Sequence, residues 1–120
     1  MSKILKLTDV EFRSDESKIL AHKLSINAVA QNLTGWTIKL FANETLLKTI
    51  TTASASTTQG KIKDQGANVG EYFFTLLSAD LVTLKSGSTI ARVPCYVRYE
   101  TGEIDPPRTF SNVEFILEIR

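Results

Sequence analysis

The chain has 120 residues, which is the size of one ordinary domain. Its 14 basic and 13 acidic residues give a net charge of +1, which argues against a nucleic-acid-binding protein or a polybasic membrane anchor. With one cysteine and one histidine, neither an intrachain disulfide nor a Cys/His zinc site can form within one chain. We therefore expect a single domain over residues 1–120, without metal or other cofactor, that binds neither nucleic acid nor membrane.

The first half of the chain reads as strands joined by polar turns. Met1–Asp9 lacks an uninterrupted apolar stretch, so it is neither a signal peptide nor a transmembrane segment, and we expect synthesis in a cytoplasm. Strands are predicted over Lys3–Phe12, which is less regular, and over Lys18–Ala28. Trp36–Ala42 alternates in hydrophobicity, and Asn43-Glu44 reads as a turn into Thr45–Ile50, which together predict a hairpin.

The second half contains three more strands and one helical candidate. Thr51–Gly60 is rich in Thr, Ser and Ala and predicts a flexible loop or an irregular edge segment. Strands are expected over Tyr72–Leu76, Val93–Tyr99 and Val113–Ile119. Pro94 cannot donate to a ladder, so its strand should lie at an edge or carry a bulge. Ser78–Gly87 predicts one helical turn, with Ser78 or Asp80 as the cap and Gly87 as the stop.

About seven strands at these spacings predict an all-β fold. We expect an antiparallel two-sheet β-sandwich, either immunoglobulin-like or jelly-roll-like, with at most one short helical turn. The chain stops at Arg120, directly after a strong strand. A natural C-terminus would look this way, and so would the end of an N-terminal domain cut from a longer protein.

No set of residues in the sequence suggests catalysis. His22 lies within a strand, with no indicated carboxylate to orient it as a base. Cys95 alternates with apolar residues, which is typical of a small core residue rather than a reactive thiolate. Asp64, Asn68 and Glu71 offer oxygen ligands, but their spacing matches no calcium-binding loop. The sequence therefore favours a protein that is not an enzyme.

Aromatic residues provide the candidates for binding. Phe41, Tyr96 and Phe110 are out of phase with the apolar face of their strands, so they are predicted to point outward and to contact a partner or ligand. Exposed aromatic rings can stack on sugars, which makes a carbohydrate site one alternative; Phe41 could instead meet a neighbouring subunit. Trp36, at the start of its strand, is better explained as a core anchor.

Four segments of the chain carry turn and strand motifs. In Gln31–Leu40, a Leu-Thr-Gly turn leads into an alternating strand. Gly70–Phe74 reads as a G-x-Y strand, Leu81–Gly87 as a short turn ending in glycine, and Arg108–Phe110 with Val113–Ile119 as a closing strand. With these motifs, spread over most of the chain from about Ser25 onward, the sequence resembles the N-terminal domains of phage baseplate upper proteins.

This resemblance implies a virion structural component, made in the host cytoplasm, that docks onto a phage tail or baseplate. Such domains act through protein–protein interfaces with other tail proteins, and homo-oligomers are usual. The family implies no catalytic residues. A carbohydrate-binding module that recognises host-surface glycans is the alternative.

Overall fold

The computed structural model describes residues 5–6, 10–12, 17–102 and 109–120, and side chains only for residues 17–102, 109, 111 and 114–120. Short strands begin the chain: β1 (Leu5–Lys6), β2 (Val10–Phe12), β3 (Lys18–Lys23), β4 (Ser25–Ile26) and β5 (Val29–Ala30). The remaining elements are β6 (Thr37–Ala42), β7 (Thr45–Ile50), β8 (Gly60–Ile62), β9 (Glu71–Leu76), α1 (Ser78–Lys85), β10 (Ala91–Glu100) and β11 (Thr109–Ile119).

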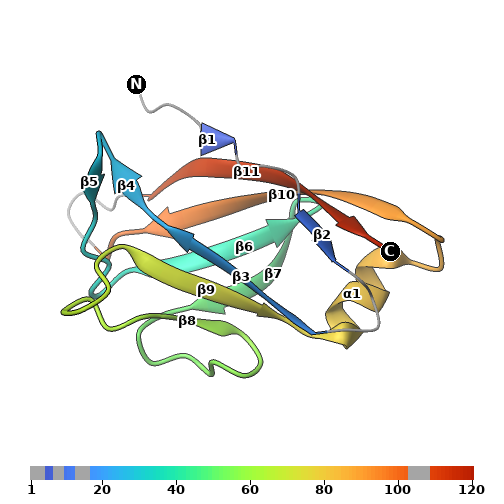
Figure 1. The fold of residues 1–120 in the computed structure, drawn as a ribbon, viewed down its shortest axis with the longest axis horizontal. Helices are drawn as coiled ribbons and strands as arrows, with labels where there is room; N and C mark the ends of the chain where they lie inside the picture. The colour runs from blue at the N-terminus through green and yellow to red at the C-terminus, as the bar shows by residue number, and fades with distance from the viewer. Residues whose placement is uncertain (1–4, 7–9, 13–16, 103–108) are drawn as a thin grey trace.

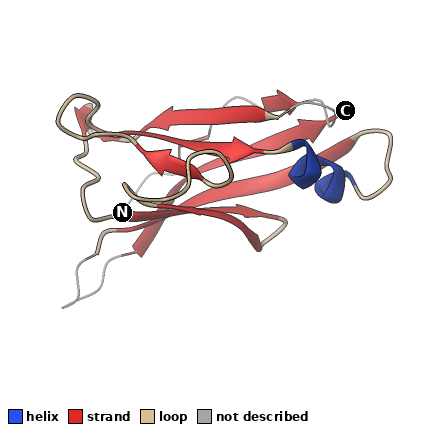
Figure 2. Cartoon of the chain, turned by 90° about the horizontal axis from the view of Figure 1, so that it is seen from below, coloured by secondary structure: helices blue, strands red, loops and turns tan. Residues whose placement is uncertain are grey.

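The strands form two packed layers, with α1 at one end and the small β4–β5 hairpin at the other (Figures 1 and 2). The larger sheet has the order β1-β11-β10-β6-β7, with β2 also on β11, and the smaller has the order β3-β9-β8. Neighbours are antiparallel, except that β1 and β2 run parallel to β11. The predicted all-β sandwich is confirmed. In the larger sheet β6, β7, β10 and β11 take the immunoglobulin places C, C′, F and G, and in the smaller sheet β3, β9 and β8 take B, E and D.

Alternate residues of both sheets point into one core, as the period of two predicts. In β11, Phe115, Leu117 and Ile119 are buried, whereas Glu114, Ile116 and Glu118 are at least partly accessible. The same alternation holds in β6 and β10 and in the first four residues of β9. The buried residues of these strands include Ile38, Leu40, Tyr72, Phe74, Val93, Cys95, Val97 and Tyr99.

The hairpin predicted at Asn43-Glu44 is confirmed. β6 and β7 pair on either side of these two residues, whose φ angles are 52° and 64°. Positive φ at both central positions defines the type I′ turn, whose twist matches that of paired strands. A register shift between Leu40 and Phe41 places Phe41 opposite Leu46, so the pair lies on the outer face of the sheet.

The predicted strand over Lys18–Ala28 is interrupted. β3 ends at Lys23 because Leu24 is buried and its backbone is held from two sides. Its N–H donates to the carbonyl of Gly70, and its carbonyl accepts from the N–H of Gln31. The chain then turns back at Asn27 and Ala28, and β4 pairs with β5.

Pro94 does not mark an edge strand, and the bulge in its strand lies elsewhere. β10 is paired on both sides, with β6 and β11, and its register shift falls between Val97 and Arg98. Pro94 is tolerated because it lies just past the end of β6. Its carbonyl accepts from the N–H of Asn43, the residue that follows β6. Proline has no N–H with which to return this bond, but the missing bond falls beyond the end of β6 and so does not interrupt the ladder.

The helix α1 is longer than the single turn predicted. Its eight residues make just over two turns. Neither Ser78 nor Asp80 occupies the cap position, which is held by Leu77. The Asp80 carboxylate instead accepts from the backbone N–H of Leu77, at 2.9 Å. The helix ends where predicted, with Ser86 in the left-handed conformation just before Gly87.

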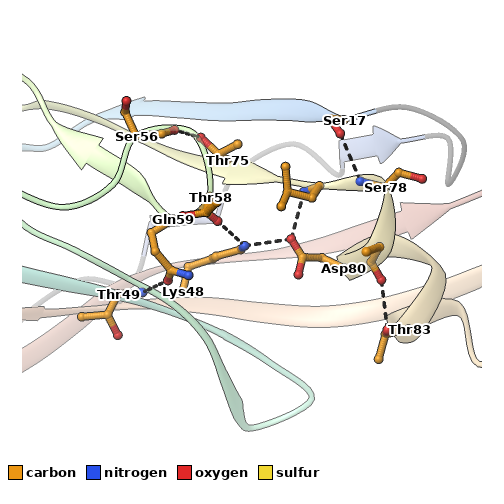
Figure 3. A network of polar contacts seen from close by, with 12 residues as sticks. Ser17, Lys48, Thr49, Ser56, Thr58, Gln59, Thr75, Ser78, Asp80 and Thr83 are labelled. Carbon is orange, nitrogen blue, oxygen red and sulfur yellow. Dashed lines mark hydrogen bonds and ion pairs between the residues drawn. The ribbon is translucent and has the colours of Figure 1, made fainter.

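A buried lysine ties α1 to the body of the sandwich (Figure 3). Lys48 in β7 is only 4% exposed, and its ammonium lies 2.8 Å from the carboxylate of Asp80. The same ammonium donates to the carbonyl of Thr58 in the β7–β8 loop. One cation thus joins a strand, a loop and the helix. The segment Thr51–Gly60, predicted as a flexible loop or an irregular edge segment, accepts hydrogen bonds from Lys48 and Thr75 and has one of its own from Ser54 to Gly60.

Removing the charge of Asp80 should destabilise the fold. In Asp80→Asn the side chain can still accept from Leu77, but the Lys48 ammonium loses its counter-charge while remaining buried. We expect the free energy of unfolding to fall by about 2 kcal/mol, because an uncompensated buried charge costs more than the pair contributes. Urea denaturation measures the change.

Two variants serve as controls for that measurement. Lys48→Met removes the buried charge itself and should cost clearly less than Asp80→Asn. Glu118→Gln breaks the more exposed pair with Arg120 and should change stability by less than about 0.5 kcal/mol. If Asp80→Asn were as mild as Glu118→Gln, the Lys48–Asp80 pair would not hold α1 in place.

Candidate functional site

Two of the three aromatic residues predicted to point outward lie together on the outer face of the larger sheet. Phe41 of β6 and Tyr96 of β10 are directly paired across neighbouring strands. Their rings are stacked, with centroids 4.8 Å apart and an angle of 5° between the planes. This spacing is that of neighbouring strands, so the pair is set by the backbone and needs no rearrangement.

The stacked pair belongs to a row of side chains that crosses the sheet. Leu46 of β7, which is 48% exposed, lies opposite Phe41, and Glu114 of β11 lies opposite Tyr96. The Arg98 guanidinium lies 5.7 Å from the centre of the Phe41 ring, within the range of a cation–π contact. We call Leu46, Phe41, Tyr96 and Arg98 the outer aromatic patch.

Charged side chains border this patch along the strands. Lys39, the cross-strand neighbour of Arg98, makes a 2.9 Å ion pair with Glu100. On the other side of Tyr96 lies a depression of about 320 Å³, lined among others by Glu44, Glu114 and Ile116. An apolar and aromatic centre with a charged border is the usual composition of a protein–protein interface.

The other aromatic candidates are placed differently. Phe110 lies in β11 opposite Tyr99, but its side chain is outside the described residues. Trp36 is half-buried and packs against the core, with its ring at an edge-to-face angle to Tyr99, which fits the predicted role of core anchor. Phe41 and Tyr96 are therefore the two predicted contact residues that the structure brings together.

His22 belongs to a hydrogen-bonded chain that enters the core. Its Nδ1 lies 2.9 Å from the hydroxyl of Tyr72, and that hydroxyl lies 2.6 Å from the hydroxyl of Tyr99. Burial lowers the pKa of His22 below its ordinary value, and burial raises the pKa of both tyrosines. These two hydrogen bonds join β3 and β9 of the smaller sheet to β10 of the larger one, which gives His22 a structural role at the edge of the core.

Cys95 is buried in β10 among apolar residues, as predicted. Burial raises the pKa of its thiol to about 12, so the thiol remains protonated near neutral pH. A protonated thiol is a poor nucleophile and a poor metal ligand. Cys95 therefore acts as a small core residue.

Gln65 is a buried polar residue that the sequence pattern did not predict. The Gln65 side-chain oxygen accepts from the N–H groups of Leu33 and Gly70, both at 2.8 Å. Its amide nitrogen donates to backbone carbonyls of the turn that contains it. Gln65 thus links the turn before β9 to the Leu33-Thr34-Gly35 turn before β6. Glutamine is usually exposed, and the groups that Gln65 binds come from separate turns, so no local pattern indicated this role.

The oxygen-bearing turn Asp64–Glu71 is explained by its internal bonds. Asp64 accepts from the N–H of Gly66, and Glu71 lies 3.5 Å from the ammonium of Lys63. Among the described residues no group of three potential metal ligands lies together. Within the same part of the chain, α1 is far too short to cross a membrane, and no other helix is present to do so.

No family model matches the chain, and no match was found among curated proteins or solved structures. What the chain does must therefore be inferred from its own residues and geometry.

The environment of His22 predicts how stability depends on pH. Because the pKa of His22 is lowered in the folded protein, the unfolded protein binds more protons below the ordinary value of 6.5. Stability should therefore fall as the pH drops through 6.5 toward the folded pKa. Urea denaturation at about pH 7.5 and about pH 5.5 measures this loss.

His22→Gln is the matched control for this pH effect. His22 is the only histidine in the chain, so the variant has no group of ordinary pKa near 6.5. Its stability should change less between the two pH values than that of the parent protein. Equal losses in both proteins would mean that His22 does not carry the effect.

Proposed function

We propose that this chain is a non-enzymatic structural domain of a phage tail or baseplate, which acts through a protein–protein interface on the outer aromatic patch. The observation that carries the interface is the row formed by Leu46, Phe41 and Tyr96 across three neighbouring strands. Aromatic and arginine side chains are enriched at the centres of interfaces, and a patch held by paired strands loses little entropy on binding.

The phage assignment is supported by the resemblance of the sequence to baseplate upper proteins. In that family a Leu-Thr-Gly turn leads into an alternating strand. Here the N–H of Trp36 donates to the carbonyl of Leu33 across this turn, and β6 follows directly. The same strand carries Phe41, so the segment of resemblance leads into the patch. We infer other tail proteins, or further copies of this chain, as the partners.

A carbohydrate-binding module is the second candidate, and the stacked pair bears on it. Sugar rings stack on the free face of an aromatic ring. Phe41 and Tyr96 turn one face each toward the other, and the Arg98 guanidinium lies near the Phe41 ring. Less ring surface is thus left for a sugar than in a single exposed aromatic residue, which favours the protein interface.

Phe41→Glu tests the proposed interface. A charge at the centre of a desolvated contact should weaken binding by about tenfold or more. The partners to be tried are the products of neighbouring genes, co-expressed with this chain and co-purified. Light scattering over a range of concentrations measures association of the chain with itself. We expect a tail protein among the neighbours, and a complex or oligomer that Phe41→Glu weakens.

Val82→Glu is the matched control, because Val82 is also an exposed apolar residue but lies on α1. It should leave association unchanged, and thermal melting should show that both variants are folded. A monomer that binds defined glycans, and loses them in Tyr96→Ala, would overturn the interface in favour of the carbohydrate module. Neighbouring genes unrelated to virion assembly would overturn the phage assignment.

A further inference from the structure

The strand β3 forms one edge of the smaller sheet (Figure 1). Among the described residues it pairs only with β9. In a constant-type immunoglobulin sandwich the first strand pairs with strand B, the place that β3 takes here. In this chain β1 and β2 pair with β11 of the larger sheet instead. Within the described part of the chain, the position beside β3 is therefore open.

The direction of the backbone groups at this edge follows from the ladder. Hydrogen-bonded and non-hydrogen-bonded pairs alternate along antiparallel strands. The N–H of Leu24 donates to the carbonyl of Gly70, so the peptide groups of the residues in phase with Leu24 point toward β9. Those of Ile19 and Ala21, which are out of phase, point toward the open edge.

The opposite side of β9 shows the same alternation. The N–H of Thr75 donates to the carbonyl of Gln59, and the N–H of Lys63 donates to the carbonyl of Glu71. Odd-numbered residues of β9 thus bond toward β8, and even-numbered ones toward β3. The alternation deduced for β3 is therefore consistent across the whole sheet.

The side chains of β3 indicate what could pair with it. Ile19 is 62% exposed and Ala21 is exposed beside it, so the middle of the edge is apolar. Lys18 and Lys23 stand at its two ends, and β3 contains no acidic residue. A second copy paired at this edge would bring two further lysines and no carboxylate to it, and like charges close together are destabilising.

We propose that the edge of β3 accepts an extended segment of another polypeptide, apolar in the middle and acidic at both ends, as an added strand. Backbone groups of Ile19 and Ala21 would pair with the added strand, its apolar residues would cover Ile19, and its acidic ends would meet Lys18 and Lys23. This site lies on the sheet opposite the outer aromatic patch and does not rest on the proposed function.

The test uses the full chain and a synthetic hexapeptide with blocked ends, Glu-Thr-Val-Thr-Val-Glu, whose glutamates are five residues apart like Lys18 and Lys23 and whose valines lie opposite Ile19 and Ala21 in the antiparallel register. A control peptide has lysines in place of the glutamates. We expect the glutamate peptide to bind about tenfold more tightly at low salt, and the difference to shrink at high salt. Amide hydrogen exchange should slow at Ile19 and Ala21, because strand addition protects outward N–H groups.

Substitutions in β3 separate strand pairing from nonspecific attraction. Ala21→Pro removes an outward N–H, which an edge strand tolerates, and should abolish binding, whereas Ala21→Ser keeps the N–H and should bind normally. Thermal melting checks that Ala21→Pro is folded. The double variant Lys18→Glu with Lys23→Glu leaves the backbone unchanged and should prefer the lysine peptide.

Several outcomes would overturn the proposal. The first is that the glutamate peptide does not bind. The second is that both peptides bind equally well, and the third is that the preference for the glutamate peptide is unchanged after charge reversal. Slow exchange at Ile19 and Ala21 in the free monomer would show that the chain itself covers the edge. Protection that grows with protein concentration would assign the edge to a second copy.

Discussion

The hydrogen bond between the hydroxyls of Tyr72 and Tyr99 is the polar contact on which the joining of the two sheets depends. Tyr72 lies on β9 of the smaller sheet and Tyr99 on β10 of the larger one, and both are fully buried. A buried hydroxyl without a partner costs free energy, so the two sheets must meet in the register that pairs these groups. Apolar packing draws the sheets together, whereas this contact favours one alignment of them.

Buried polar groups fix the two ends of the sandwich in the same way. Gln65 bonds the turns around the β4–β5 hairpin, and Lys48 bonds the β7–β8 loop to α1. Loops without regular ladders would otherwise leave backbone groups unpaired near the core. Gln65 thus holds the turn that leads into β6, and Lys48 holds β7, which pairs with β6, so both contacts support the strand that carries Phe41.

Local patterns predicted strands and turns well, and long-range pairing poorly. The period of two gave the inward and outward residues of β6, β10 and β11, because each of these strands has one buried face. It could predict that Phe41 and Tyr96 point outward, but not that they stack, since their strands are distant in the sequence and no local signal sets which strands pair. Lys48 is in phase with the buried Ile50 in β7, and this alternation indicated that the lysine faces the core. Gln65 gave no comparable sign, because the groups it binds come from separate turns.

The placement of the first strands has consequences for both sheets. β1 and β2 run parallel to β11 and so close the β11 edge of the larger sheet, while β3 at the edge of the smaller one has no such neighbour among the described residues. An edge strand is normally protected by charge, and β3 has its lysines only at the ends, around an exposed isoleucine. The two sheets therefore present different surfaces: a face of side chains on one, and a row of backbone groups on the other. If both proposed surfaces bind, two partners can be held at once, because the surfaces lie on opposite layers of the sandwich.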